Sequence, residues 1–90
     1  MTTSQQVEKV VKGFANYHRI EMLKLIKSKP ELSLNDVSKE LKVNLKTTSE
    51  HLRRLTIAGL IFKRSRGQNV LHKLSPLGED ILKFLRKLEQ

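Results

Sequence analysis

Two helix-start signals separated by a three-residue break constrain the fold of this chain more than any other feature, and they lie between residues 33 and 58. Ser33 can cap a helix in which Asp36 stands three residues on, a variant of the capping box. Asn44 can cap a second helix, and the chain has only residues 42–44 in which to turn between the two. This spacing predicts a helix-turn-helix.

The second helix of this pair, expected over residues 45–58, has two unlike faces. Helical periodicity places on its inner face Leu45, Thr48, Leu52 and Leu55. The outer face carries Lys46, Thr47, Ser49, Glu50, Arg53 and Arg54. Gly59 follows as the expected left-handed residue after the helix. A cationic, hydroxyl-rich face over a leucine stripe is typical of a recognition helix that enters the major groove of DNA.

Capping residues and hydrophobic periodicity predict the remaining elements. We expect further helices over about residues 4–14, 17–28, 34–41 and 76–89, and strands over about 60–65 and 70–74. The strands flank Arg66-Gly67-Gln68-Asn69, a four-residue connection containing glycine, which indicates a hairpin. We therefore expect one domain over residues 1–90 with a mainly α fold. It would be a winged helix-turn-helix with about five helices and a two- to three-stranded sheet, in which the β-hairpin is the wing.

The positive charge of the chain is concentrated in the same region. The formal net charge is +9, and residues 42–73 contain eight bases against one acid, Glu50, which leaves +7 in that third of the chain. A localised basic region that coincides with one structural unit predicts a nucleic-acid binder. The alternative is a lysine-rich surface that only keeps a small protein in solution.

Arg53 is the first candidate for reading a base, because arginine to guanine is the commonest specific contact in the major groove. Thr47 and Ser49 can serve either phosphates or bases. Glu50 can accept from a cytosine amino group, or it can pair with Arg53 or Arg54 on the same helix, and we favour the pair.

The hairpin tip carries further bases, Lys63, Arg64 and Arg66, around Gly67. They would lie along the DNA backbone or in the adjacent minor groove. The alternative is an edge hairpin kept soluble by its charges. The full set of expected DNA contacts is Lys42, Lys46, Thr47, Ser49, Glu50, His51, Arg53, Arg54, Lys63, Arg64, Arg66 and Gln68.

The residues that would form a metal site or an active site are missing from the sequence. There is no cysteine, and His18, His51 and His72 show no metal-ligand spacing. We expect each histidine to be partly buried and hydrogen-bonded, although His51 stands on the recognition helix beside Arg54. No nucleophile is paired with a local base and no glycine-rich phosphate loop occurs, so we expect neither an enzyme nor a cofactor.

No apolar run approaches the roughly 18 residues of a membrane span, and the N-terminal MTTSQQVEKVVKG lacks the hydrophobic segment of a secretory signal. We therefore expect a soluble cytoplasmic protein that does not bind membranes.

The runs FANYHRIEMLKLI and LKVNLKTTSEHLRRLTIAGLIFKRSRGQNVLHKL resemble the winged-helix core of the ArsR-type repressors, without a gap from Leu41 to Leu74. The matching marks are Arg19, the segment 49–52 (SEHL), Leu55, the corner 58–61 (AGLI) and Gly67. The tail LSPLGEDILKFL is more similar to the ending of MarR-type regulators.

The resemblance implies a homodimeric transcriptional repressor whose terminal helices form the dimer interface. The interface residues would be Val7, Val10, Val11, Phe14, Ile81, Phe84, Leu85 and Leu88. Where metal-sensing members have a cysteine pair, this chain has ELSLND at residues 31–36, and its final helix has no histidine, so we expect no metal site. Lys42 replaces the small residue often found in the turn.

Taken together, these features predict a sequence-specific, double-stranded DNA-binding transcriptional regulator. It would be a homodimer with the helix 45–58 in the major groove and the wing 63–69 on the backbone or in the minor groove. A two-fold symmetric dimer would bind a palindromic operator. The alternatives are a winged-helix module that binds another protein and an architectural DNA binder without sequence preference.

Overall fold

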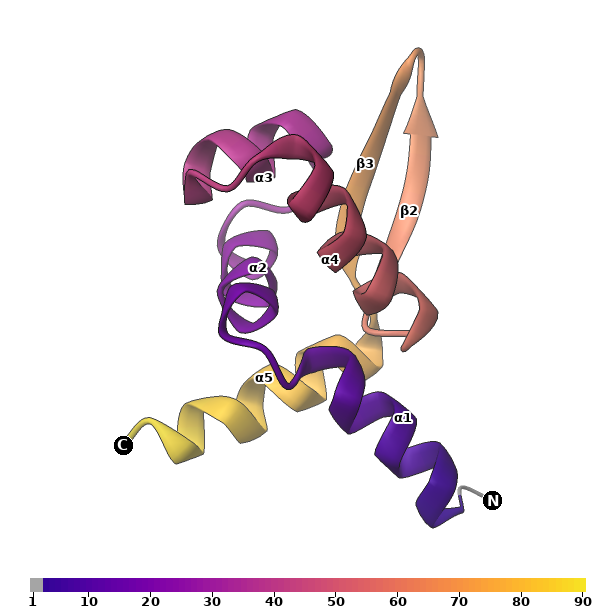
Figure 1. Ribbon diagram of the computed structural model, residues 1–90, viewed down its shortest axis with the longest axis vertical. Coiled ribbons are helices and arrows are strands. Elements are labelled where there is room, and N and C mark those ends of the chain that lie inside the picture. The colour runs from indigo at the N-terminus through magenta and orange to yellow at the C-terminus, as the bar shows by residue number, and fades with distance from the viewer. Residues whose placement is uncertain (1–2) are drawn as a thin grey trace.

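Residues 3–90, which the computed structural model describes, form five α-helices and a three-stranded antiparallel sheet (Figure 1). In chain order the elements are α1 (Ser4–Phe14), α2 (Tyr17–Ser28), β1 (Leu32–Ser33), α3 (Leu34–Leu41), α4 (Leu45–Ile57), β2 (Ile61–Arg66), β3 (Asn69–Leu74) and α5 (Pro76–Leu88). The mainly α, winged helix-turn-helix architecture predicted from the sequence is confirmed.

Polar side chains fix where the helices begin. The Ser33 hydroxyl accepts from the Asp36 backbone N–H at 3.2 Å, while the Asp36 carboxylate accepts from the Ser33 N–H at 3.1 Å. This capping box at the start of α3 was expected from the sequence. The Ser75 hydroxyl accepts from the Gly78 N–H at 2.9 Å, with Pro76 at the first position of α5. These local hydrogen bonds satisfy backbone N–H groups in the first turns of α3 and α5.

The wing turns more tightly than the sequence indicated. Arg66 and Asn69 pair directly across β2 and β3, so the turn contains only Gly67 and Gln68. The expected four-residue connection was therefore wrong. Gly67 has a φ of +62°, which glycine adopts without strain and which two-residue hairpin turns require at their first position. This conformation lets both strands extend to the tip.

A third strand joins the hairpin from the other side. β1 pairs with β3 in the register Leu32 to His72 and Ser33 to Leu71, which places β3 at the centre of the sheet. The Glu31 backbone N–H extends this pairing by donating to the His72 carbonyl at 2.9 Å. Two residues are too few to show the alternation of a strand, so the sequence located only the hairpin.

The core lies around α2, with α3 and α4 on one side of it, α1 and α5 toward one end of the molecule, and the wing projecting toward the other end (Figure 1). Its most deeply buried side chains are Met22, Leu23, Ile26, Val37, Thr48, Leu55, Leu60, Ile61 and Leu82. None of the helices within residues 3–90 has the length and apolar character to cross a membrane.

Three apolar residues differ from their expected places. Phe14 and Leu85, expected at a dimer interface, are buried in the core of the single chain. Leu45, expected on the buried stripe of α4, is 49% exposed at the first position of that helix, and the buried stripe begins at Thr48. The apolar residues of the terminal helices that remain exposed are Val7, Val11, Leu77, Phe84 and Leu88.

Gly78 determines how closely α5 approaches the start of the wing. A Cβ at this position would overlap the backbone carbonyl oxygen of Leu60, which no side-chain rotation can move. We expect Gly78→Ala to lower the free energy of unfolding by about 1–3 kcal/mol despite the better helix propensity of alanine. Urea denaturation measures this loss. Lys83→Ala, an exposed change on the same helix, is the control and should alter stability by less than about 0.5 kcal/mol. Equal stability of the two variants would contradict the close approach.

Candidate nucleic-acid interface

The turn between α3 and α4 is held by the carbonyl group of Val43. This carbonyl accepts from the hydroxyl of Ser38 on α3 and from the hydroxyl of Thr48 on α4, the latter at 3.3 Å. Lys42 adopts the left-handed conformation, with φ 56° and ψ 41°, which costs a residue with a Cβ about 1 kcal/mol. The hydroxyl bonds from both helices stabilise this conformation, and Lys42 keeps an exposed charge at the turn.

The outward face of α4 begins at its cap. The Asn44 side chain accepts from the Thr47 backbone N–H at 2.8 Å and so fixes the first turn. The buried residues of this helix are Thr48, His51, Leu52 and Leu55. The expected DNA contacts on the same helix that stand exposed are Lys46, Ser49, Glu50, Arg53 and Arg54, and Thr47 is half-buried.

Glu50 pairs with both arginines of this face, as the sequence favoured. Its Oε1 accepts from Arg54 Nε at 3.0 Å and lies 3.5 Å from Arg53 Nη1. The hydrogen bond from Arg54, with the charges of both arginines, lowers the pKa of the Glu50 carboxyl. The group is exposed, so the pairs add little to stability. The two arginines are therefore bound unequally by Glu50, with Arg54 held more closely than Arg53.

His51 lies inside the protein, which corrects its place among the expected DNA contacts. It is 9% exposed, and its Nδ1 accepts from Arg19 Nε at 3.0 Å. Burial of the ring, followed by the charges of Arg19 and His18, lowers the pKa of His51. The physical reason is helical phase, because position 51 lies three residues after Thr48 and four before Leu55, on the buried stripe.

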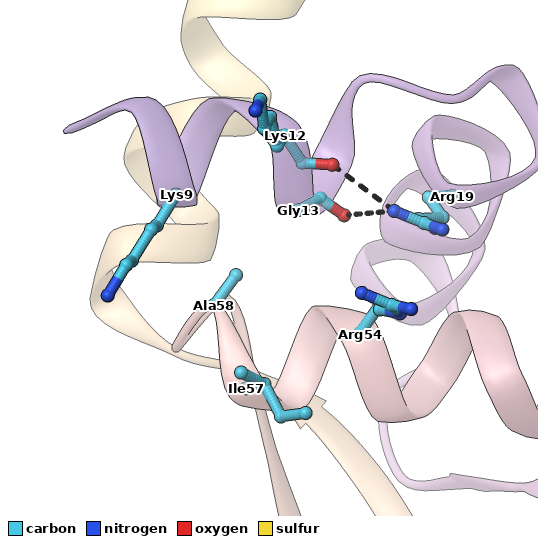
Figure 2. A pocket seen from close by; sticks show the side chains of 7 residues that line it. All are labelled: Lys9, Lys12, Gly13, Arg19, Arg54, Ile57 and Ala58. Carbon is cyan, nitrogen blue, oxygen red and sulfur yellow. Dashed lines mark hydrogen bonds between the residues drawn. The ribbon is translucent and has the colours of Figure 1, made fainter. Parts of the chain in front are cut away.

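Arg19 on α2 makes hydrogen bonds to both α1 and α4, and Figure 2 shows those to α1. Its Nη1 donates to the carbonyls of Lys12 and Gly13 at the end of α1, both at 3.2 Å. Its Nε reaches His51 on α4. The sequence marked Arg19 only through its family resemblance. No local spacing pairs residues 19 and 51, so the contact follows from the packing of α2 against α4.

The bases of the wing are engaged to different degrees. Arg64 Nη2 donates to the Glu31 carboxylate at 2.7 Å, which ties that guanidinium to the loop before β1. Lys63, Arg66 and Gln68 are exposed. A cavity of about 180 Å³ between α4 and the hairpin is lined by both Ser49 and Lys63, so the outward faces of the helix and the wing adjoin.

The other two histidines have structural contacts. His72 is buried, its Nδ1 lies 2.9 Å from the Leu32 carbonyl oxygen, and burial is the main cause of its lowered pKa. His18 is half-buried between the rings of Tyr17 and His51, with centroids 4.1 and 5.6 Å away. Over residues 3–90, no three side chains of the His, Cys, Asp or Glu type come together as a metal site would require.

Comparison with known proteins gives one family. The sequence model described as bacterial regulatory protein, arsR family, matches residues 17–63, from the start of α2 into β2. A comparison with curated proteins found no match.

Solved structures resemble the chain over nearly its whole length. The solution structure of a homodimeric winged helix-turn-helix DNA-binding domain, Mb0332 from Mycobacterium bovis, described as a possible ArsR-family regulator, has a TM-score of 0.85 at 23% identity, covering 94% of this chain and 79% of that one. Reduced HlyU from Vibrio cholerae has a TM-score of 0.81 at 28% identity, covering 94% and 90%. The MarR family transcription regulator SP03579 has a TM-score of 0.79 at 20% identity, covering 97% and 60%.

The contact between Arg19 and His51 makes stability depend on pH. The hydrogen bond needs a neutral ring with a free lone pair on Nδ1, and the pKa of His51 is lowered on folding. The contribution of neutral His51 to the free energy of unfolding is therefore complete above the ordinary histidine pKa of about 6.5. It is lost as the pH falls through the lowered pKa that His51 has in the folded protein. NMR titration of the histidine ring protons should give a midpoint for His51 below about 6.5.

The matched variant is His51→Gln, whose amide oxygen can accept from Arg19 but does not titrate. Its free energy of unfolding should fall less steeply between about pH 7 and pH 5 than that of the wild type, because only the contribution of His72 remains from these two buried rings. A midpoint at or above 6.5 for His51 would contradict the neutral, accepting ring.

Proposed function

The chain belongs to the arsR family of bacterial regulatory proteins, and on that premise we propose that it is a homodimeric repressor that binds specific sites on duplex DNA. The family and the fold are those of DNA-binding transcription regulators and not of enzymes.

The observation that carries the proposal is the surface made by the outer face of α4 and the adjoining wing. Its exposed bases are Lys46, Arg53, Arg54, Lys63 and Arg66, and the only acid between residues 42 and 73 is Glu50. Arg64 lies on the face of β2 opposite Lys63 and pairs with Glu31. A major groove about 12 Å wide admits one helix. We place α4 there, with the wing beside it on the backbone or in the minor groove.

The contacts of Glu50 distinguish the two arginines of α4. Arg54 donates its Nε to Glu50 at 3.0 Å, whereas Arg53 lies at the 3.5 Å limit of a hydrogen bond. Arg53 therefore has more of its guanidinium available, and we assign it the bidentate contact to a guanine edge. Arg54 and Lys42 would contact phosphates. Because Glu50 already has two partners on its own helix, we give it no base contact.

The remaining contacts follow from exposure. Lys46, Thr47 and Ser49 lie at the N-terminal end of α4, the part that reaches base edges in helix-turn-helix proteins. Arg66 and Gln68 at the tip of the wing, and Lys63 beside the recognition helix, would contact the backbone or the minor groove. His51 has no place in this set because its ring is buried.

A homodimer is supported by the apolar residues that a single chain leaves in water. Val7 and Val11 on α1 and Phe84 and Leu88 on α5 are exposed, and both helices lie at the end of the molecule opposite the wing tip (Figure 1). The Mycobacterium bovis domain is described as homodimeric. Two α4 helices related by a two-fold axis would meet successive major grooves about 34 Å apart, which predicts a palindromic operator.

The role of Arg53 is tested on DNA selected from a random pool. We expect Arg53→Ala to weaken binding to the selected duplex by about 1–3 kcal/mol and binding to random duplexes much less, because a base contact is lost. Fluorescence anisotropy over a series of salt concentrations measures both. Arg86→Ala, an exposed arginine on α5, is the control and should bind like the wild type.

Other outcomes identify the alternatives. An equal loss on selected and random DNA would make Arg53 a phosphate contact. The logarithm of the affinity should fall with a slope of about −0.9 per phosphate neutralised against the logarithm of salt concentration. A weak, flat response would favour a protein-interaction module, and selection without any preferred sequence would favour an architectural binder.

The dimer interface is tested by one charge on α1. We expect Val11→Glu to shift the protein from dimer to monomer in sedimentation equilibrium, because it places a carboxylate in the proposed apolar contact. Val70→Glu on the wing is a matched control, since Val11 and Val70 are 44% and 43% exposed. It should remain dimeric. A dimer that tolerates Val11→Glu as well as Val70→Glu would remove α1 from the interface.

A further inference from the structure

A cleft lies between α1 and the C-terminal end of α4, on a part of the surface that includes residues not used by the proposed DNA contacts (Figure 2). Its volume is about 280 Å³. Four basic side chains line it: Lys9 and Lys12 from α1, Arg19 from α2 and Arg54 from α4. Bases from three helices thus converge on one concavity.

The positive charge of the cleft is only partly balanced. Lys12 lies 3.6 Å from the exposed carboxylate of Glu8, and Arg54 donates to Glu50. The charge of Arg54, after burial, is a cause of the lowered pKa of Arg19, so the two guanidinium groups repel each other. An anion between them would relieve that repulsion, and the concavity would shield the interaction from water.

Both arginines also have donors to spare. Arg19 uses Nε for His51 and Nη1 for the carbonyls of α1, and over residues 3–90 nothing accepts from its Nη2. Arg54 donates only through Nε, to Glu50, within the same part of the chain. A guanidinium presents its N–H groups in a planar fork that matches the two oxygens of a carboxylate or phosphate. The cleft therefore offers two such forks to one anion.

The rest of the lining is apolar. Ile57 is 68% exposed at the mouth of the cleft, and Ala58 and Gly13 form its floor. A Cβ on Gly13 would overlap the Cβ of Ala58, so this glycine brings α1 close to the end of α4. An inorganic ion or a phosphate group of the DNA backbone would make no use of these carbons. The lining instead fits a ligand with an apolar group beside its charge.

We infer that this cleft binds a small organic anion, a carboxylate on a compact apolar group such as an aromatic ring, with the carboxylate at Arg19 and Arg54 and the ring against Ile57 and Ala58. Lys9 and Lys12 contribute charge at the rim. They stand on the side of α1 opposite Val7 and Val11, so the proposed dimer contact leaves the cleft open. Arg54 is the one lining residue that the proposed phosphate contacts also use.

The test is an NMR titration of the ¹⁵N-labelled protein with benzoate in the absence of DNA. We expect saturable shifts of the backbone signals of Gly13, Ile57 and Ala58 and of the Arg54 Nε–H, with a Kd on the order of millimolar. Benzyl alcohol has the ring without the charge, and inorganic phosphate has the charge without the ring. Each should bind more than about tenfold more weakly.

Variants locate the site. Arg54→Gln should weaken benzoate binding by more than about tenfold, whereas Arg86→Gln, an exposed arginine on α5, should leave it unchanged. Lys9→Gln should weaken it several-fold, and Lys39→Gln on α3 should not. All four positions are exposed, so the fold is retained.

Three results would overturn the inference. The signals would not saturate with benzoate well above millimolar concentration, phosphate would bind as tightly as benzoate, or the benzoate-induced shifts would be unchanged in Arg54→Gln. Shifts of Gly13 and Ile57 with a duplex but not with benzoate would assign the cleft to the DNA backbone, which also overturns it. Because the benzoate titration contains no DNA, failure of the proposed DNA binding would leave its outcome unaffected.

Discussion

The guanidinium group of Arg19 on α2 links α1 to α4 through hydrogen bonds. It donates to the last carbonyls of α1 and to the ring of His51 on α4. Since His51 accepts through Nδ1, its neutral ring must carry the proton on Nε2. The guanidinium group thus provides hydrogen bonds for two carbonyl groups at the C-terminal end of α1 and fixes the tautomer of a buried histidine. These bonds, together with the close contact of Gly13 and Ala58, hold α4 against α1.

The outer face of α4 is organised by its single acid. Glu50 takes most of its hydrogen bonding from Arg54 and little from Arg53, so two arginines that are neighbours in sequence have unequal freedom to bind other groups. The negative charge of Glu50 also lowers the net positive charge of this face, although all its lysines and arginines remain present. Glu31, in the loop before β1, holds Arg64 of the wing in a similar way. Acids placed beside particular bases therefore decide which cations of a strongly basic chain remain available.

Local signals predicted most of the fold, and long-range contacts account for the errors. Ser33, Asn44 and Ser75 cap helices as their sequence positions indicated, because a cap depends on bonds within three residues. The stripe of α4 was assigned to Leu45, Thr48, Leu52 and Leu55 and left out His51, which shares the helical phase of the last three. Phe14 and Leu85 show that an apolar stripe does not tell whether the same chain or a partner covers it. The two residues of β1 and the pairing of residues 19 and 51 exist only through tertiary packing.

The bonds of Arg19 have a geometric consequence for a two-fold assembly. If α1 belongs to the contact between protomers, a rigid link from α1 to α4 fixes the distance and the angle between the two α4 helices of the dimer. B-DNA advances about 3.4 Å and rotates about 34° for each added base pair, since a turn of about 34–36 Å contains about 10–10.5 base pairs. A spacer longer by one pair would then misplace the second half-site in both distance and angle at once. Loosening the Arg19 bonds would widen the range of spacers accepted.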